Sequence, residues 1–234
     1  MNKKFMKVMA LSMAVMTSAA VFASCGKDGG GATETNGGTT GGDSTATAFK
    51  IGCIGPATGD AAIYGKAVFN GIQIAVDEIN AKGGSIKFEF KSEDDVADGE
   101  TAVNAYNTLV DWGMQALVGP VTTGSSIAVS AKTAEDKMFM LTPSGSSTDI
   151  IKDKDNVFQV CFTDPNQGTG SADYIAEHMA DKKVAIIYRN DDAYSQGIRD
   201  TFVSEAAAKS IEVVYQGTFT KDTATDFSVQ LTAA

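Results

Sequence analysis

Apolar positions from residue 49 onward follow two alternating periods. Short apolar or alternating runs, which favour strands, lie at 49–55, 86–91, 116–119, 138–143, 157–162, 183–188 and 211–217. Between them, apolar residues recur with a helical period, which predicts helices over 63–82, 99–113, 124–136, 167–180 and 193–209. This repeated strand–helix order predicts an α/β fold in which helices cover both faces of parallel sheets.

The alternation is interrupted near 162–165, where an extended run leads into Pro165. This break predicts a first α/β lobe over 49–163 and the start of a second α/β lobe over 164–234. Two parallel strands alone make a poor core, so the second lobe is expected to be incomplete within this sequence. Residues 226–234 resemble the opening of a further helix, although a helix that simply ends the protein is the alternative.

The first 24 residues have a different pattern, with three lysines at 1–7 and an uncharged run over 8–24. A basic start, a short apolar run and small residues before a cleavage point are typical of a secretory signal peptide. The tetrapeptide FASC at 22–25 resembles a bacterial lipobox, although lipoboxes usually have leucine in its first position. We therefore expect Cys25 to be lipidated after cleavage; the alternative is a secreted protein with a spare thiol.

Residues 25–48 contain no large apolar side chain, and 26–48 hold eight glycines and six threonines. Such a segment cannot form a core and behaves as a flexible tether. Together with a lipid on Cys25, it predicts an extracytoplasmic protein that is anchored to the cell membrane without spanning it.

The net charge argues against one class of partner. The chain has 19 Lys+Arg and 29 Asp+Glu, a formal charge of -10, and removal of the three leader lysines would leave 16 minus 29, or -13. So acidic a chain is a poor nucleic-acid binder.

The sequence offers few metal ligands. With one histidine and neither an H-E-x-x-H nor a C-x-x-C motif, it predicts no metal site and no cofactor. Cys53 and Cys161 are interpreted as small core residues.

Hydroxyl-rich loops follow two of the expected strands, and ligands of open α/β sheets bind at the carboxyl ends of strands. Thr123 belongs to GPVTTGSS (119–126), which leads into a helix whose first N–H groups attract anions. Ser144, Gly145 and Ser146 belong to TPSGSS (142–147). These loops are expected to hold a small carboxylate without an arginine. The same residue types also cap helices and form turns, so that alternative stays open.

Two other strand-end loops carry a tyrosine each. Tyr64 lies in GPATGDAAIYG (55–65) and Tyr194 in RNDDAYSQG (189–197). Facing tyrosines from two lobes would enclose a ligand side chain, but Tyr64 also fits the apolar stripe of a helix, where it would serve packing. The acidic run at 93–95 either caps the next helix, the favoured interpretation, or binds a cation.

These segments resemble the type I periplasmic binding proteins of the branched-chain amino-acid class, which are solute receptors of ABC importers. The run NGIQIAVDEINAKGG (70–84) is the most specific part of the match. The resembling segments span nearly all of 51–231 and lie at 51–84, 92–98, 117–130, 138–149, 157–168 and 184–197.

The resemblance implies two Rossmann-like lobes that close on an amino acid and deliver it to a membrane permease. It implies that Tyr64 and Tyr194 lie beside the ligand, one from each lobe, and that the Thr123 hydroxyl binds the ligand carboxylate. It also implies a backbone contact at Ser144 and a hydroxyl contact at Ser146. Relatives usually run on further, so the acidic partner of the ligand ammonium is expected beyond Ala234.

The same sequence features bear on two other functions. A sensory ligand-binding domain for an amino acid or amide would share the fold, but a sensor usually needs a spanning helix and the lipobox argues against it. A serine hydrolase would need a G-x-S-x-G elbow, which is absent, and His178 lies in a predicted helix away from the strand ends. The sequence therefore predicts a binding protein and not an enzyme.

Overall fold

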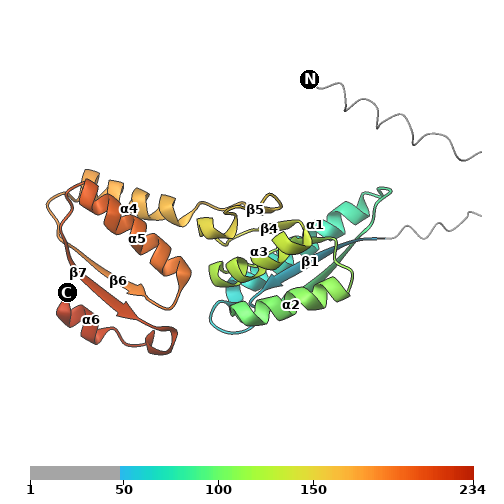
Figure 1. The fold of residues 1–234 in the computed structure, drawn as a ribbon, viewed down its shortest axis with the longest axis horizontal. Helices are drawn as coiled ribbons and strands as arrows, with labels where there is room; N and C mark the ends of the chain where they lie inside the picture. Colours follow the sequence, from blue (N-terminus) through green and yellow to red (C-terminus); the bar gives the residue numbers. More distant parts are fainter. Residues whose placement is uncertain (1–47) are drawn as a thin grey trace, which may run out of the picture. The chain divides into compact units, whose positions relative to one another are not determined.

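The computed structural model describes residues 48–234 (Figure 1). The expected signal peptide, Cys25 and all but the last residue of the tether lie outside the described residues. The first sheet has the order β2-β1-β3-β4-β5, and every neighbouring pair is parallel. Its strands are β1 (Phe49–Gly55), β2 (Phe88–Asp94), β3 (Ala116–Val118), β4 (Met140–Thr142) and β5 (Val157–Gln159).

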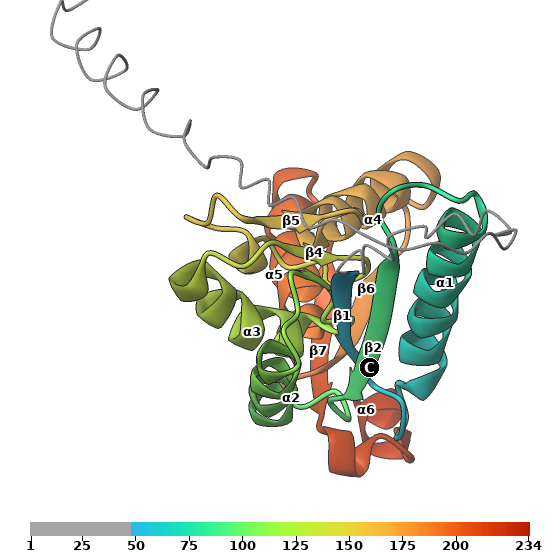
Figure 2. The ribbon, with the colours of Figure 1, turned by 90° about the vertical axis from the view of Figure 1, so that its right-hand side faces the viewer.

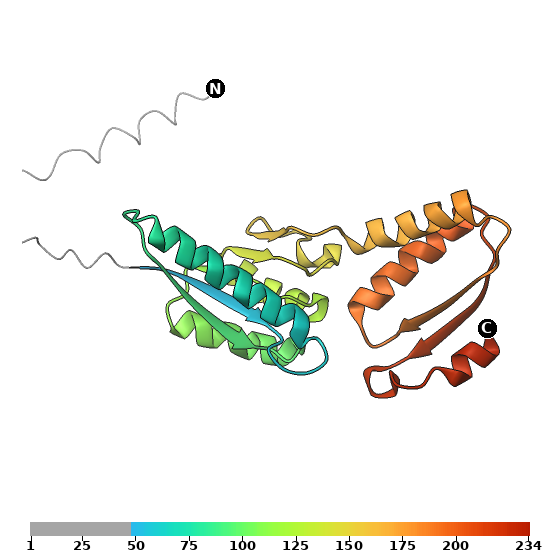
Figure 3. The same ribbon diagram turned by 180° about the vertical axis from the view of Figure 1, so that it is seen from behind.

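Helices cover both faces of this sheet, as the strand–helix order predicts. Figures 2 and 3 show α1 on one face and both α2 and α3 on the other. The three helices are α1 (Ala62–Ala81), α2 (Gly99–Asp111) and α3 (Thr123–Asp136).

The main core lies between the sheet and the pair α2 and α3. Its fully buried members come from both helices, from strands β1, β3 and β4, and from a short 3-10 turn at Thr148–Ile150; the largest are Ile54, Tyr106, Leu109, Leu117, Met140 and Ile150. In contrast, α1 buries only Gly65 and Val76. The carboxyl edge of β3 and β4 is therefore held by a well-packed α2–α3 layer.

Local signals explain where these helices begin and end. The Asp98 side chain caps α2 by accepting a hydrogen bond from the Thr101 N–H. Helix α3 follows the extended residue Thr122 and ends at Lys137, which adopts a left-handed conformation with φ 56°.

The second sheet contains only β6 (Val184–Arg189) and β7 (Val213–Phe219), paired in parallel. Helices α4 (Asp164–His178) and α5 (Ala193–Ala208) lie side by side on it, and α6 (Ser228–Ala233) contacts β7 (Figure 3). The core here is small: its buried members are Ala172, Phe202 and Ala206. The two sheets fall on either side of the expected lobe boundary at 163–164, which stays a prediction.

Several expected boundaries are wrong because strand length depends on the partner strand. The expected strand at 138–143 forms ladder bonds only over Met140–Thr142, and the one at 157–162 only over Val157–Gln159.

The helix expected at 167–180 begins earlier, at Asp164, because Pro165 lies in its first turn, where no N–H is needed. A second 3-10 turn, Lys221–Thr223, was not predicted.

Candidate functional site

Thr123 and Ser146 meet at the carboxyl edge of the first sheet. Strands β3 and β4 are parallel neighbours, so the loops that follow them leave the sheet at the same edge. Thr123, 4% exposed, is the first residue of α3, and its Oγ1 accepts a hydrogen bond from the Ser146 N–H at 3.3 Å. The structure thus brings together two of the site residues expected from the sequence.

The start of α3 has the chemistry of an anion site. The first N–H groups of a helix have no intrahelical acceptor and carry partial positive charge. The Thr122 side chain, at the N-cap, makes no capping hydrogen bond to them. The Thr123 hydroxyl accepts from Ser146 and so keeps its own hydrogen to donate. This arrangement suits a carboxylate.

The loop after β4 is held by its own hydrogen bonds. The Thr142 hydroxyl accepts from the N–H groups of Gly145 at 2.8 Å and Ser144 at 3.4 Å. The Gln159 amide donates to the carbonyl oxygens of Gly145 and Ser147, both at 2.8 Å. The amide donors of Ser144 and Gly145, expected to serve a ligand, are therefore engaged within the protein.

Gly145 has a packing role as well. A Cβ at this position would lie 2.7 Å from Ser126 Oγ and 2.8 Å from Thr142 Oγ1, so no larger residue fits without movement. Ser144 is exposed, whereas Ser146 is buried. Of the three loop residues, Ser146 is the one that is bonded to Thr123, through its backbone N–H.

The two candidate tyrosines remain accessible. Tyr64 lies in the first turn of α1 and is 63% exposed, so its side chain is not buried among the described residues, and its role beside a ligand stays a prediction. Tyr194, 40% exposed, lies at the start of α5, and its hydroxyl donates to Gln167 Oε1 at 3.1 Å. Burial raises the pKa of Tyr194, and the hydrogen bond to Gln167 opposes this rise.

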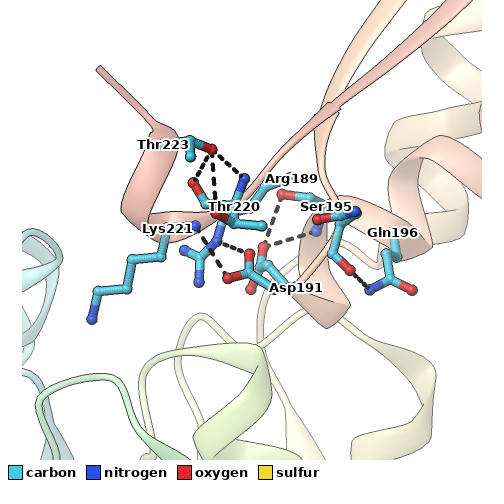
Figure 4. Close-up of polar contacts among 9 residues, drawn as sticks. Arg189, Asp191, Ser195, Gln196, Thr220, Lys221 and Thr223 are labelled. Carbon is cyan, nitrogen blue, oxygen red and sulfur yellow. Dashed lines mark hydrogen bonds and ion pairs between the residues drawn. The ribbon is translucent and has the colours of Figure 1, made fainter. Parts of the chain in front are cut away.

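Polar contacts hold the loop that leads into the first turn of α5 (Figure 4). Asp191 accepts from Arg189 Nε at 2.6 Å and from the Lys221 N–H at 3.1 Å. The hydrogen bond from Arg189, more than any other contact, lowers the pKa of Asp191. Asp192 caps the helix by accepting from the Ser195 N–H at 3.0 Å. The loop after β6 is therefore tied to the turn after β7.

The acidic run at 93–95 does not cap the next helix, because Asp98 does so. Instead, the Asp94 carboxylate accepts from the Ala57 N–H at 2.8 Å and the Thr58 hydroxyl at 2.7 Å. It thereby joins the loop after β2 to the loop after β1, which leads to Tyr64. This link between the two loops was not predicted from the sequence. The sequence showed only that the acidic run lies at the end of a strand.

The burial of two carboxyl groups, those of Asp95 and Asp164, was not predicted from the sequence. Burial raises the pKa of both. Asp95 Oδ1 accepts from the Ala97 N–H at 2.9 Å, whereas its Oδ2 has no hydrogen-bond partner. Buried acids of this kind are recognised only from the tertiary structure, since exposed and buried aspartates look alike in a sequence.

The cysteine interpretation holds for one of the two residues. Cys53 is fully buried, and burial raises the pKa of its thiol. Cys161 is only half-buried, and its Sγ donates to the Gly145 carbonyl at 3.3 Å. It thus braces the loop after β4 rather than filling the core.

His178 ends α4 on the surface, against the ring of Tyr174. Within residues 48–234, no group of three or more His, Cys, Asp or Glu side chains is arranged to hold a metal ion. In the same residues, no helix combines the length and the apolar character that a membrane span requires.

A family model described as "Periplasmic binding protein" matches residues 48–234. The Leu/Ile/Val-binding protein BraC3 of Rhizobium johnstonii is 38% identical over 175 residues, which cover 74% of this chain and 47% of that protein. The Leu/Ile/Val-binding protein homolog 3 of Brucella melitensis is 37% identical over 188 residues, covering 79% of this chain and 50% of that protein. The chain thus spans about half the length of the curated relatives it matches.

A solved structure shares the fold. It is the branched-chain amino acid transporter substrate binding protein LivJ of Streptococcus pneumoniae, crystallised with isoleucine. It matches with a TM-score of 0.74 and 32% identity, over 80% of this chain and 53% of that one.

Proposed function

Since this chain belongs to the periplasmic binding protein family, we propose that it is a solute-binding receptor that captures an amino acid for an ABC importer. The family is one of binding proteins, and it implies an extracytoplasmic location. The proposed mechanism is closure of two lobes on the ligand, which a membrane permease then recognises.

The observation that carries the proposal is the hydrogen bond between Ser146 and Thr123 at the start of α3. In this bond the Thr123 hydroxyl is the acceptor, so its own hydrogen stays available, beside the first N–H groups of α3, which have no intrahelical acceptor. The hydroxyl and the N–H groups together favour a carboxylate as ligand. No arginine is needed, because the helix start supplies the positive end of a dipole.

We propose a branched-chain amino acid as the ligand. The relatives above are named for leucine, isoleucine and valine, and the matched structure was crystallised with isoleucine. The two exposed tyrosines, Tyr64 and Tyr194, would supply apolar walls with polar tips for an aliphatic side chain. The loop residues Ser144, Gly145 and Ser146 are neutral, which suits a zwitterion better than a dianion.

Isothermal titration calorimetry tests the function directly. L-leucine, L-isoleucine and L-valine are each titrated into the protein that contains this chain, from residue 26 onward, and L-glutamate, benzoate and urea are titrated as ligands of other chemistry. We expect saturable binding of the aliphatic L-amino acids alone. Binding of benzoate or urea in their place would change the ligand class, and no binding of any of the six would contradict the receptor function.

We further propose that Cys25 carries the lipid that anchors the protein to the membrane. The lipobox-like FASC at 22–25 and the glycine-rich tether support this. In membrane fractionation, Cys25→Ser should move the protein from the membrane to the soluble fraction. Cys161→Ser, which changes a cysteine in the folded body, should remain with the membrane; release of both variants, or of neither, would contradict the anchor.

A further inference from the structure

Asp164 is a buried acid without a compensating charge. It is the first residue of α4 and is 1% exposed, and neither of its carboxylate oxygens has a hydrogen-bond partner. In residues 48–234, no lysine or arginine forms an ion pair with it. A buried carboxylate is costly unless it is paired, hydrogen-bonded or neutralised by a proton.

Ser146 is the polar side chain held next to Asp164. The Asp164 N–H donates to the Ser146 carbonyl at 3.0 Å, which fixes the two residues beside each other. Ser146 is 2% exposed, and its Oγ also lacks a hydrogen-bond partner. Two buried polar side chains without hydrogen-bond partners therefore belong to residues that the backbone holds side by side. Burial raises the pKa of Asp164, and the Ser146 hydroxyl opposes this rise.

The other groups around Asp164 supply no cation. From α5, Gly197 lies so close that a Cβ there would be 2.8 Å from Asp164 Oδ2. The charge of Asp192, the N-cap residue of α5, adds to the rise in the pKa of Asp164. The charge of Asp164 in turn raises the pKa of Tyr194, in the first turn of α5, and of Cys161, in the segment before α4. One of these is an acid and the other two are neutral at physiological pH, so none stabilises the ionised form.

The Ser146 hydroxyl has one hydrogen and two possible acceptors. When Asp164 is ionised, that hydrogen is needed by Asp164, and Ser146 Oγ then presents only lone pairs to a ligand carboxylate. When Asp164 is protonated, its own O–H donates to Ser146 Oγ, and the Ser146 hydrogen is free to donate to the ligand.

We propose that Asp164 is a positioning residue whose proton sets the direction of the Ser146 hydroxyl and so couples ligand binding to proton uptake. The inference rests on the proposed function, because it takes Ser146 as a contact of the ligand carboxylate. Binding of one carboxylate ligand then transfers one proton from the solvent to Asp164. Affinity rises as the pH falls, by up to about tenfold in Kd for each pH unit.

Calorimetry of L-isoleucine with the full chain tests this, in pairs of buffers with different ionisation enthalpies, from about pH 5 to about pH 7.5. Wild type should take up a fraction of a proton that rises toward one with increasing pH. Asp164→Asn keeps the shape of the protonated acid and donates an N–H to Ser146 Oγ. We expect it to bind with no proton uptake, and with a pH-independent affinity that the wild type approaches as the pH falls.

Two matched controls separate Asp164 from other titrating groups. Asp173→Asn changes an aspartate in the same helix that is ion-paired with Lys209 on the surface, and it should keep the wild-type proton uptake. His178→Gln replaces the surface histidine at the end of the same helix, and it should also behave as wild type. Ser146→Ala removes the hydroxyl itself and should abolish proton uptake while weakening binding, even if Asp164→Asn does not fold.

The outcomes separate this inference from the proposed function. Isoleucine binding without proton uptake in wild type, or uptake that persists in Asp164→Asn or Ser146→Ala, overturns the coupling and leaves the receptor function standing. Absence of isoleucine binding at every pH overturns both. Uptake in wild type and both controls, but in neither site variant, supports the coupling.

Discussion

The backbone N–H of Ser146 donates to the hydroxyl of Thr123, 3.3 Å away, although the two residues are 23 positions apart in the chain. The bond joins the loop after β4 to the first turn of α3, and both residues are buried. Two proposed ligand contacts are therefore held in place by each other before any ligand arrives, which lowers the ordering cost of binding.

Thr123→Ala should weaken both the fold and the site. It leaves the buried Ser146 N–H without its acceptor, which lowers the free energy of unfolding by about 1–2 kcal/mol. It also removes a donor to the ligand carboxylate and weakens isoleucine binding by about 1–2 kcal/mol. Urea denaturation and calorimetry measure the two effects. Thr123→Ser keeps the hydroxyl and should recover most of both, and an unchanged affinity in Thr123→Ala would remove Thr123 from the site.

Tyr194→Ala should reduce affinity with little effect on the ligand-free fold. The side chain is 40% exposed and makes one hydrogen bond, to Gln167, so the free energy of unfolding should fall by less than about 1 kcal/mol. Isoleucine affinity should fall clearly, because an apolar wall is lost. Tyr174→Ala, at an exposed tyrosine of α4, should leave affinity unchanged. A large loss of stability in Tyr194→Ala would mark the residue as a packing residue instead.

Two glycines of α4 should respond oppositely to alanine. A Cβ on Gly168 would lie 2.6 Å from the Phe202 backbone nitrogen and would also clash with Thr201, so Gly168→Ala should destabilise by about 1–3 kcal/mol. A Cβ on Gly170 meets nothing within 4 Å, so Gly170→Ala should stabilise by about 0.5–1 kcal/mol through helix propensity. Chemical denaturation of both variants tests this; equal effects would contradict the close approach of α4 and α5.

Asp95→Asn should stabilise the protein at neutral pH and not at acid pH. Burial raises the pKa of Asp95, so folding favours its protonated form. Below the pKa of the unfolded chain the carboxyl is protonated in both states, and no cost exists. As the pH rises through the folded-state pKa, the cost of the buried charge appears in full and then stays constant.

Asparagine keeps an oxygen for the Ala97 N–H, so the variant removes the charge while retaining that acceptor. Thermal unfolding from about pH 3.5 to about pH 7.5 should show that the stability of the variant relative to wild type increases as the pH rises. Asp181→Asn, at an exposed aspartate beside Lys182, should follow the wild-type curve. A stability gain of Asp95→Asn that is largest at acid pH would contradict the raised pKa of Asp95.

Local patterns were sufficient for the order of the main strands and helices and for locating the strand-end loops of the candidate site. The strand expected at 49–55 has those bounds, and the helix expected at 193–209 ends one residue earlier. Both signals are local, since an apolar period and an N-cap such as Asp192 act within a few residues. The strand-end loops that contain Thr123 and Ser146 were found in the same way, because parallel strands place their following loops at one edge.

The tertiary structure decided what those loops do. Strands β4 and β5 are shorter than their apolar runs because only the paired residues form a ladder. The amides of Ser144 and Gly145 serve the Thr142 hydroxyl, and Asp164 is buried between the loop after β4 and α5. These outcomes depend on partners distant in the chain. The sequence by itself therefore determined the elements, their order and the residue types at the site, while long-range hydrogen bonding and burial determined which of those groups stay free to bind.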